Sequence, residues 1–472
     1  MSRKIITLFS TIILMFAFSC QYNTPPIKPD PGNNNGSTEE PELLLSKREM
    51  RAVWLTTAWG LDWPLGKYDP PSQKELYIRY IDLFKELNMN AVIVQIKPMG
   101  DAFYRSSYEP WCEWISGTRG KDPGYDVLQF MIEEAHKKGL EFHAWMNPYR
   151  IDTRAGSGDS FAPLHSEVKR EWVLDLEKIQ IYNPALPEVR QRLADIVKEL
   201  LTDYEVDGIH FDDYFYPYPS QAGSLFSDAE EYAKYGEGYA TVEDFRRGNV
   251  DKAIKAVQEV IVSTRPEAVF TVSPLASIEG NMNTLFADVV KWCKEGWIDI
   301  VMPQLYQQGD AFKNNLDIWS HYNYKATLMS GHYTYQFGAS EIARQIGLIR
   351  KNKKNVGHAH YRAETILSNK DGIRDRLKQL YNNPAVIPFT GREVAAAPIK
   401  PHNVSINNGI LSWSLSGDDR AVVYHFENLE KEGTVMAITR ERNIPVSAAG
   451  YYCVTALNAD NKESEPSKPL KK

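Results

Sequence analysis

The stretch DGIHFDDYFYPYP (residues 207–219) joins a short strand pattern to an acidic pair and an aromatic loop. Ile209 and Phe211 are apolar and alternate with small or polar residues, as on a strand that packs one face against helices. The same alternation turns His210 and Asp212 toward the opposite face. The stretch therefore predicts a strand whose last inward side chain is a carboxylate.

Seven further strand-like runs accompany this one, and an amphipathic helical stretch follows each of the eight. The predicted strands lie at residues 51–58, 91–97, 140–147, 206–212, 268–274, 298–304, 325–331 and 355–360. The predicted helices lie near residues 71–88, 124–138, 187–203, 241–263, 284–296, 311–321, 339–350 and 371–382. Eight strand–helix units in a row predict an α/β fold, the (β/α)8 TIM barrel. A doubly wound open sheet would need a GxGxxG motif after a strand, and none follows a strand here.

Three loops that follow predicted strands are unusually long, at residues 98–123, 148–186 and 213–240. In a TIM barrel the chemistry lies on the loops after the strands, and loops of this length in a compact domain usually carry function. Strand alternation predicts which side chains near these loops point into the barrel. They are Gln95, Lys97, His143, Trp145, Asn147, His210, Asp212, Gln304 and Tyr306. This set is polar toward the strand ends, where an active site belongs.

Five motifs follow one another in a recognisable order. They are RAVWLTTAWGLDWP (51–64), QIKPMGDAFYRSSYEPW (95–111), GYDVLQFMIEEAHKKGLEFHAWMNPYR (124–150), DGIHFDDYFYPYP (207–219) and DIVMPQLY (299–306). Residues 48–385 thereby resemble the glycosyl hydrolase-like family 10, formerly domain of unknown function 187. The resemblance implies a TIM-barrel glycoside hydrolase. The characterised branch of that family includes divisome-localised lipoproteins that cut peptidoglycan strands stripped of their peptide stems, which implies a cell-wall substrate here. Lys97 departs from the family, which more often carries arginine there, so the charge is kept and the bidentate fork is lost.

Glycoside hydrolysis usually needs two carboxyl groups, one to protonate the leaving oxygen and one as nucleophile or base. Asp212 is the first candidate. The spacing of DGIHFD (207–212) resembles a strand motif of several sugar-cleaving barrels, in which the final aspartate is the nucleophile. The predicted strand 268–274 ends without an acid, so the second carboxyl must come from a loop. We rank Asp213 and Asp101 above Glu109, and Asp213 is either the catalytic partner or a loop cap. A 2-acetamido group on the substrate could instead act as the nucleophile, with the two adjacent aspartates orienting it and protonating the leaving group.

Sugar recognition is expected from aromatic faces and from hydrogen-bonding side chains around the carboxylates. The predicted substrate-binding residues are Gln95, Lys97, Trp111, His143, Asn147, Arg150, His210, Tyr214, Gln304 and Tyr306. About half of a wider aromatic set is expected to face ligand: Trp59, Trp63, Tyr104, Trp111, Tyr149, Tyr214, Phe215 and Tyr216. Other open interpretations are a hydrolase of another polysaccharide and a non-catalytic glycan-binding lipoprotein.

We expect no metal and no cofactor. His143, His210 and Asp212 could mimic the metal site of amidohydrolase-type barrels, but such a site also needs an HxH on the first strand, and residues 51–59 have none. The formal net charge of −7 gives no electrostatic reason to bind nucleic acid or anionic lipid. Three cysteines besides Cys20 form no CxxC motif, so buried free thiols are expected. We expect a monomer.

The N-terminal segment predicts a secretory signal followed by a flexible tether. Residues 1–19 have the layout of a secretory signal, with two basic residues before a short apolar run. The run ends in Ala-Phe-Ser-Cys, which resembles a bacterial lipobox and predicts lipidation of Cys20. Residues 20–47 are rich in Pro, Asn and Gly and predict a disordered tether. We therefore expect a lipoprotein of the bacterial cell envelope, held in the outer membrane on its periplasmic face.

The C-terminal segment predicts a separate domain. Residues 48–390 are assigned to the barrel, and residues 395–472 alternate apolar and polar residues in short runs separated by turn residues. Trp413 and the run YYCVTALNADNKESEPS (451–467) resemble a fibronectin type III sandwich. Trp413, Tyr424, Tyr452 and Val454 are expected in its core.

Overall fold

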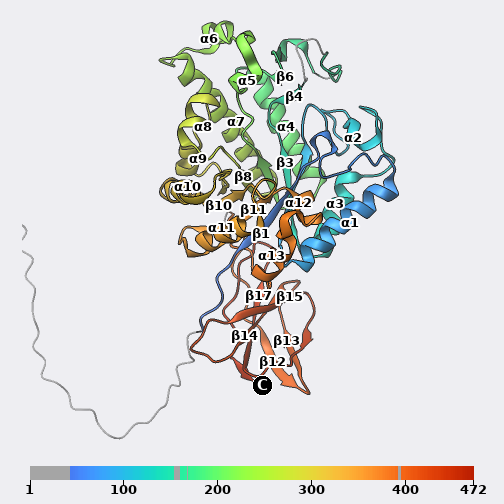
Figure 1. Cartoon of the computed structure of the whole chain (residues 1–472), viewed down its shortest axis with the longest axis vertical. Coiled ribbons are helices and arrows are strands. Elements are labelled where there is room, and N and C mark those ends of the chain that lie inside the picture. The colour runs from blue at the N-terminus through green and yellow to red at the C-terminus, as the bar shows by residue number, and fades with distance from the viewer. Residues whose placement is uncertain (1–42, 154–159, 167, 392–394) are drawn as a thin grey trace, which may run out of the picture. The chain divides into compact units, whose positions relative to one another are not determined.

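A closed parallel barrel of eight strands forms the larger part of the chain (Figure 1). The computed structural model describes residues 43–153, 160–166, 168–391 and 395–472. The strand order around the barrel is β1-β11-β10-β9-β8-β7-β3-β2. The strands are β1 (Met50–Leu55), β2 (Ala91–Lys97), β3 (Glu141–Met146), β7 (Gly208–Phe211), β8 (Val269–Val272), β9 (Ile300–Val301), β10 (Thr327–His332) and β11 (Asn355–Tyr361). The predicted TIM barrel and all eight predicted strands are confirmed.

Helices follow the strands and surround the barrel (Figure 1). The principal ones are α1 (Pro70–Glu86), α3 (Val127–Lys137), α4 (Pro187–Asp203), α7 (Val242–Thr264), α9 (Val289–Glu295), α10 (Gly309–Tyr322), α11 (Ala339–Lys351) and α13 (Ile373–Leu380). Their starts follow from local sequence. The side chain of Asp69 caps α1 by accepting a hydrogen bond from the Ser72 amide, and Asp126 caps α3 in the same way. Each of the eight predicted helices has a counterpart.

The two faces of each strand bury different side chains, as the alternation predicts. Ile209 and Phe211 of β7 lie in the apolar layer between strands and helices. Trp54 and Trp145 lie instead in a smaller cluster inside the barrel. Because the interior is filled by such side chains, the barrel is a packed core without a central channel, and an active site is expected at its C-terminal end.

The three long loops carry secondary structure of their own. Loop 98–123 contains α2 (Glu113–Ser116). Loop 148–186 contains a three-stranded antiparallel sheet of β4 (Arg150–Thr153), β5 (Val173–Asp175) and β6 (Ile179–Tyr182). Loop 213–240 contains α5 (Pro219–Ala222), the 3-10 turn η3 (Gly223–Leu225) and α6 (Ala229–Tyr235). These elements build up one side of the barrel's C-terminal end.

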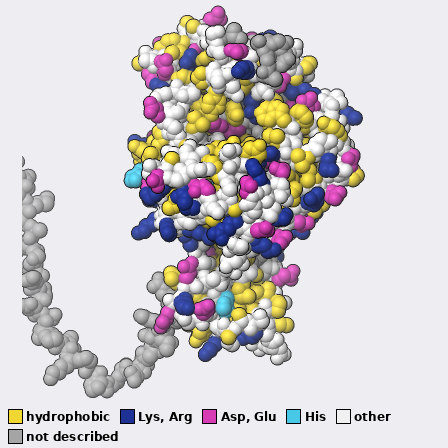
Figure 2. Space-filling view, in the orientation of Figure 1, with side chains coloured by type: hydrophobic (Ala, Val, Ile, Leu, Met, Phe, Trp, Pro, Cys, Tyr) yellow, Lys and Arg dark blue, Asp and Glu magenta, His cyan; other side chains and the backbone are white. Residues whose placement is uncertain are grey.

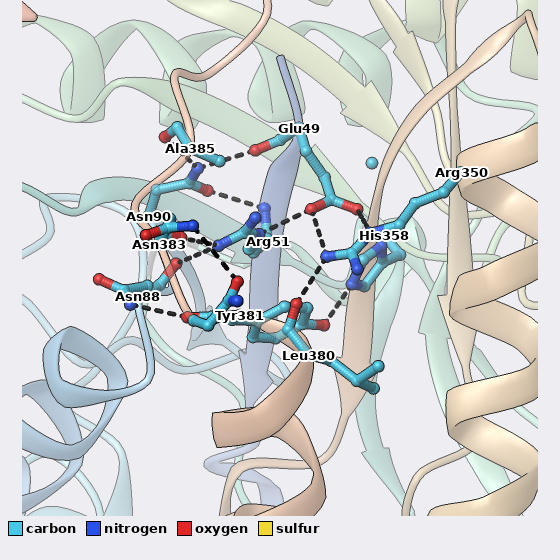
Figure 3. A network of polar contacts seen from close by, with 12 residues as sticks. Glu49, Arg51, Asn88, Asn90, Arg350, His358, Leu380, Tyr381, Asn383 and Ala385 are labelled. Carbon is cyan, nitrogen blue, oxygen red and sulfur yellow. Dashed lines mark hydrogen bonds and ion pairs between the residues drawn. The ribbon is translucent and has the colours of Figure 1, made fainter. Parts of the chain in front are cut away.

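A network of charged and polar groups closes the opposite end of the barrel (Figure 3). Glu49, just before β1, accepts hydrogen bonds from Arg51 at 2.7 Å and from Arg350 of α11 at 2.9 Å. Arg51 also donates to the carbonyl of Asn383 at 2.7 Å and lies 4.6 Å from the ring centre of Tyr381. The network joins the first strand to the last helices at this end, while the pairing of β1 with β11 closes the barrel.

The C-terminal residues form two antiparallel sheets. One has the order β12-β13-β16 and the other β15-β14-β17-β18. Their strands are β12 (His402–Asn407), β13 (Ile410–Ser414), β14 (Arg420–Phe426), β15 (Thr434–Thr439), β16 (Asn443–Pro445), β17 (Tyr451–Leu457) and β18 (Leu470–Lys471). The four aromatic and aliphatic residues predicted for the core are buried there. The all-β arrangement fits a small sandwich, and its fibronectin type III topology stays a prediction.

Two smaller expectations concern cysteines and membranes. Cys112, Cys293 and Cys453 are free thiols and buried, as predicted. No helix in the described part of the chain has both the length and the apolar character needed to span a bilayer. Cys20 and the signal segment lie outside the described residues.

Candidate active site

A cavity of about 370 Å³ opens at the end of the barrel where the strands end. Its walls come from strands β1, β2, β3 and β11 and from the loops that follow β1, β3, β7, β8, β9 and β10. The lining residues are Trp54, Thr56, Ala58, Trp59, Gln95, Trp145, Arg150, Asp212, Asp213, Tyr214, Tyr218, Ser273, Leu275, Gln304, Tyr306, Tyr333 and Tyr361. Figure 2 shows hydrophobic side chains gathered on the visible face over this end, where Figure 1 places β4, β6 and α5. Asp212 and Asp213 are the only carboxylates among the lining residues, all of which are described.

Asp212 follows the last residue of β7 and points into the barrel, as the alternation predicts. Its Oδ2 accepts a hydrogen bond from Trp145 Nε1 at 3.0 Å and another from Asn147 Nδ2. Its Oδ1 faces the Tyr214 amide at 3.3 Å. Trp145 belongs to the neighbouring strand β3, so two adjacent barrel strands hold this carboxyl in place.

Asp213 turns back over the mouth of the barrel and lines the cavity beside Asp212. Its Oδ2 accepts a hydrogen bond from the Tyr218 hydroxyl, and the Gln304 side chain also bonds to it. Tyr218 lies five residues further along the same loop, and Gln304 follows β9. The two aspartates therefore line one wall of the cavity and have different hydrogen-bond donors.

Burial changes the protonation of both carboxyls. Desolvation, and next the negative charge of Asp213, raise the pKa of Asp212 to about 7, against the attraction of Arg150. Desolvation also raises the pKa of Asp213, which the hydrogen bonds from Tyr218 and Gln304 oppose. Since two adjacent buried carboxylates cannot both ionise easily, the pair is set up to share a proton near neutral pH.

Arg150 supports the acidic pair from the side. Its Nη2 donates to Asn147 Oδ1 at 2.6 Å, and its Nε donates to the Pro98 carbonyl at 2.9 Å. Gln95 Nε2 donates to the same Asn147 oxygen at 2.9 Å, so Asn147 must turn its amide nitrogen toward Asp212. The guanidinium also lies 4.5 Å from the ring centre of Tyr214. These contacts bring together four predicted residues with Asp212.

Aromatic side chains form the rest of the wall. Tyr306 stacks on Tyr333 with ring centres 4.6 Å apart, and Tyr361 lies beside both. Trp59 is half-exposed at the rim. About half of the wider aromatic set of eight was expected to face ligand, and two of them, Trp59 and Tyr214, line the cavity. Trp63, Tyr104, Tyr149, Phe215 and Tyr216 are buried, and Trp111 packs against the core between strands and helices.

Lys97, Asp101 and Glu109 lie away from the cavity in a buried group of charges under the loop after β2. Lys97 Nζ donates to the Met99 carbonyl at 2.7 Å and lies 3.5 Å from Glu109 Oε1. Glu109 also accepts a hydrogen bond from Tyr182 at 3.0 Å and lies 3.6 Å from Arg192. Asp101 pairs with Arg119 at 3.4 Å. Neither acid lines the cavity that holds Asp212 and Asp213.

The two predicted inward histidines are both buried but lie at different depths. His210 Nε2 accepts a hydrogen bond from Trp54 Nε1 at 3.1 Å and lies 3.1 Å from the Ser273 hydroxyl, beneath the acidic pair. Desolvation lowers the pKa of His210, so it is neutral there. His143 instead pairs with Glu141 at 3.0 Å, at the start of β3. Among the described residues, no group of three or more His, Cys, Asp or Glu is arranged to hold a metal ion.

Several lining residues were not predicted from the sequence. They are Trp54, Thr56, Ala58, Tyr218, Ser273, Leu275, Tyr333 and Tyr361. Alternation along β1 and β8 could have identified Trp54 and Ser273, because both lie on the inward face of a strand. Tyr218 carries no such signal, because its position depends on the path of the loop.

Comparison with known proteins adds a family to this geometry. The sequence model of the family described as Glycosyl hydrolase-like 10 matches residues 49–343. Glycosyl hydrolase YngK of Bacillus subtilis (strain 168) is 36% identical over 390 residues, which cover 75% of this chain and 76% of YngK. Glycosyl hydrolase DigH of Escherichia coli (strain K12) is 34% identical over 324 residues, 61% of this chain and 72% of DigH. Among solved structures, the glycoside hydrolase domain of PgaB from Bordetella bronchiseptica has a TM-score of 0.48 and 13% identity, covering 70% of this chain and 98% of that domain.

Proposed function

Because the chain belongs to the glycosyl hydrolase-like 10 family and is a glycoside hydrolase, we propose that it cleaves peptidoglycan glycan strands that lack peptide stems. The observation that carries the proposal is the pair of adjacent, buried carboxyls in a cavity with an aromatic wall. Peptidoglycan sugars carry 2-acetamido groups, and an adjacent acidic pair suits a reaction in which such a group takes part. The resemblance of the sequence motifs to the peptidoglycan-cutting branch of the family supports the same substrate.

Asp212 is the proposed general acid. Its raised pKa leaves a large fraction of the carboxyl protonated near pH 7, which is the state that can donate to the glycosidic oxygen. As the bond between the anomeric carbon and the leaving oxygen breaks, that oxygen takes the proton from Asp212. Trp145 and Asn147 donate hydrogen bonds to the same carboxyl and stabilise the anion that remains.

Asp213 is the proposed orienting group for the acetamido arm. Its carboxylate is held by Tyr218 and can accept the acetamido N–H. The acetamido oxygen then attacks the anomeric carbon to form a cyclic intermediate. Water then attacks the anomeric carbon and breaks its bond to the acetamido oxygen, and the proton that the water loses passes to Asp212 and regenerates the acid. The competing mechanism makes Asp213 a direct nucleophile, which would leave a glycosyl ester on the enzyme.

One assay tests substrate and mechanism together. Purified protein is incubated with peptide-free peptidoglycan strands, with chitin and with plant glucans, and newly formed reducing ends are measured. Release from the peptide-free strands alone supports the proposal. Equal release from glucans, which have no acetamido group, would contradict it, and retention of strands without cleavage would favour the non-catalytic interpretation. An N-acetylglucosamine-derived thiazoline, which mimics the cyclic intermediate, should inhibit competitively.

The cellular address is a second part of the proposal. We propose that Cys20 is lipidated and holds the protein in the outer membrane, on its periplasmic face. The lipobox-like sequence supports this proposal, because acyl chains on a cysteine can anchor a protein to a membrane. The Cys20→Ala protein should be released from sedimented membranes. If it still sediments with membranes, the lipoprotein interpretation is wrong.

A further inference from the structure

A second cavity, of about 440 Å³, lies on the flank of the barrel between α7 and α9. None of its lining residues lines the catalytic cavity. We call it the flank groove and define it by Tyr239, Arg247, Gly248, Lys252, Lys291 and Trp297. The first half of α7 forms its floor. Because α7 follows β7, the strand that ends at the catalytic aspartates, this part of the helix lies toward the catalytic end of the barrel.

The position of Tyr239 in the groove depends on a glycine. Gly248 lies inside the long helix α7, where glycine costs about 0.5–1 kcal/mol relative to alanine. A Cβ atom there would lie 2.3 Å from the Tyr239 hydroxyl and 2.4 Å from its ring. The glycine therefore lets the ring lie directly on the helix. Phe245 holds the ring from its edge, with ring centres 5.7 Å apart.

Positive charges stand beside the two aromatic rings of the groove. Lys252 Nζ lies 5.3 Å from the ring centre of Tyr239, and Lys291 Nζ lies 5.5 Å from the ring of Trp297. Lys291 is paired with Asp251 at 2.7 Å. Among the described residues, no carboxylate forms an ion pair with Lys252. The lining residues carry four basic and three acidic side chains. Arg247 is paired with Asp244 at 2.7 Å and Lys255 lies 3.9 Å from Glu259, so Lys252 is the lining cation that the ion pairs leave for a ligand.

We propose that the flank groove binds a segment of an anionic glycan, away from the bond being cut. The idea rests on the proposed function, since a peptide-free peptidoglycan strand carries a free carboxylate on alternate sugars. Tyr239 and Trp297 are each partly exposed and can contact the apolar faces of sugar rings, and Lys252 offers an ammonium to a carboxylate. Binding two parts of one strand raises the effective concentration of the remainder at the catalytic cavity.

The test measures binding and turnover separately. Binding of long peptide-free strands is measured by calorimetry with the Asp212→Asn protein, which is not expected to consume the ligand. Adding Tyr239→Ala or Lys252→Gln should weaken this binding roughly three- to tenfold. Tyr324→Ala is the matched control, because Tyr324 is an exposed aromatic residue outside the groove. Binding equal to that of the control in both folded variants would overturn the proposal.

Two further arms sharpen the result. In the otherwise wild-type protein, Tyr239→Ala should leave the hydrolysis of a short soluble oligosaccharide unchanged and slow only the hydrolysis of long strands. Lys252→Gln should weaken binding of peptide-free strands but not of neutral chitin oligomers, and an equal loss on both would refute the anionic ligand. If wild-type protein releases no reducing ends from any glycan, the proposed function fails, while the calorimetry still decides whether the groove binds strands.

Discussion

Two pairs of buried carboxylates follow β7 and β2, two strands that β3 separates in the barrel, and they differ in their surroundings. Asp212 and Asp213 line the cavity, and their nearest cation, Arg150, donates its hydrogen bonds to Asn147 and Pro98 instead. Asp101 and Glu109 are equally buried, but each lies within 3.6 Å of a cation. Burial raises the pKa of Asp101 as well. Burial alone therefore does not identify a catalytic carboxyl; a catalytic pair also needs access to a cavity and the lack of a direct counter-charge.

The largest effect is expected when one carboxyl of the pair Asp212 and Asp213 is removed. Asp212→Asn should lower activity on the glycan substrate roughly 10²- to 10⁴-fold, the scale of one acid–base group, because an amide cannot donate the proton. Reducing-end release measures the loss, and circular dichroism checks that the protein is folded. Full activity in a folded Asp212→Asn protein would refute the assignment and redirect the search to Asp101 and Glu109.

The stability of the wild-type protein should also depend on this pair. The folded state keeps the Asp212 proton up to a pKa of about 7, whereas an unfolded aspartate loses it near 3.8. The folded state therefore binds more protons between these values, and stability falls as the pH rises from about 4 to 7, by up to ~4 kcal/mol. Urea unfolding at several pH values in this range measures the free energy of unfolding. This free energy should change less with pH in the Asp212→Asn protein than in the wild type. The same pH dependence of stability in both proteins would contradict the raised pKa of Asp212.

Removing a carboxyl of the second pair, Asp101 and Glu109, should lower the stability of the protein and not its catalytic activity. Glu109→Gln leaves the fully buried ammonium of Lys97 without its partner, and breaking a buried ion pair costs about 3 kcal/mol. Urea unfolding measures this loss, and activity per folded molecule should be retained. Asp122→Asn is the control, because the Arg105–Asp122 pair is exposed and its loss should change stability by less than about 1 kcal/mol. A Glu109→Gln protein that is stable but inactive would place Glu109 in the reaction.

The sequence was sufficient to predict the barrel, because each strand repeats the same two-residue alternation of apolar and other side chains and a helix separates each strand from the next. Within a regular strand, alternation also placed Asp212, Trp145 and His210 in the interior. It failed for Lys97, because the pairing of β2 with β3 shifts register between Gln95 and Lys97. The side chain of Lys97 is consequently buried under the following loop.

Loop residues were harder to predict, because no period relates their position in the sequence to a direction in space. Asp101, Glu109 and Trp111 follow β2 closely, yet the chain turns them into a buried charge group or against the core. Tyr218 has the opposite fate, since its loop brings it back to Asp213. Sequence motifs can therefore identify a catalytic strand end more readily than the partners that complete its site.

The smallest expected effect tests Tyr218 as the hydrogen-bond partner of Asp213. Tyr218→Phe removes the hydroxyl that donates to Asp213, and this hydrogen bond favours the charged carboxylate. The pKa of Asp213 should therefore rise, and the acid limb of the pH–activity profile should move up by about one pH unit, since a hydrogen bond to a charged group contributes roughly 1.5 kcal/mol. Activity on the acid side of the profile should fall by up to about tenfold and recover as the pH rises. Tyr214→Phe is the control, because Tyr214 also lines the cavity but offers Asp212 its backbone amide, not its hydroxyl. A uniform loss at every pH would show that Tyr218 acts on the substrate directly, whereas an unchanged profile would leave Asp213 without the role proposed for it.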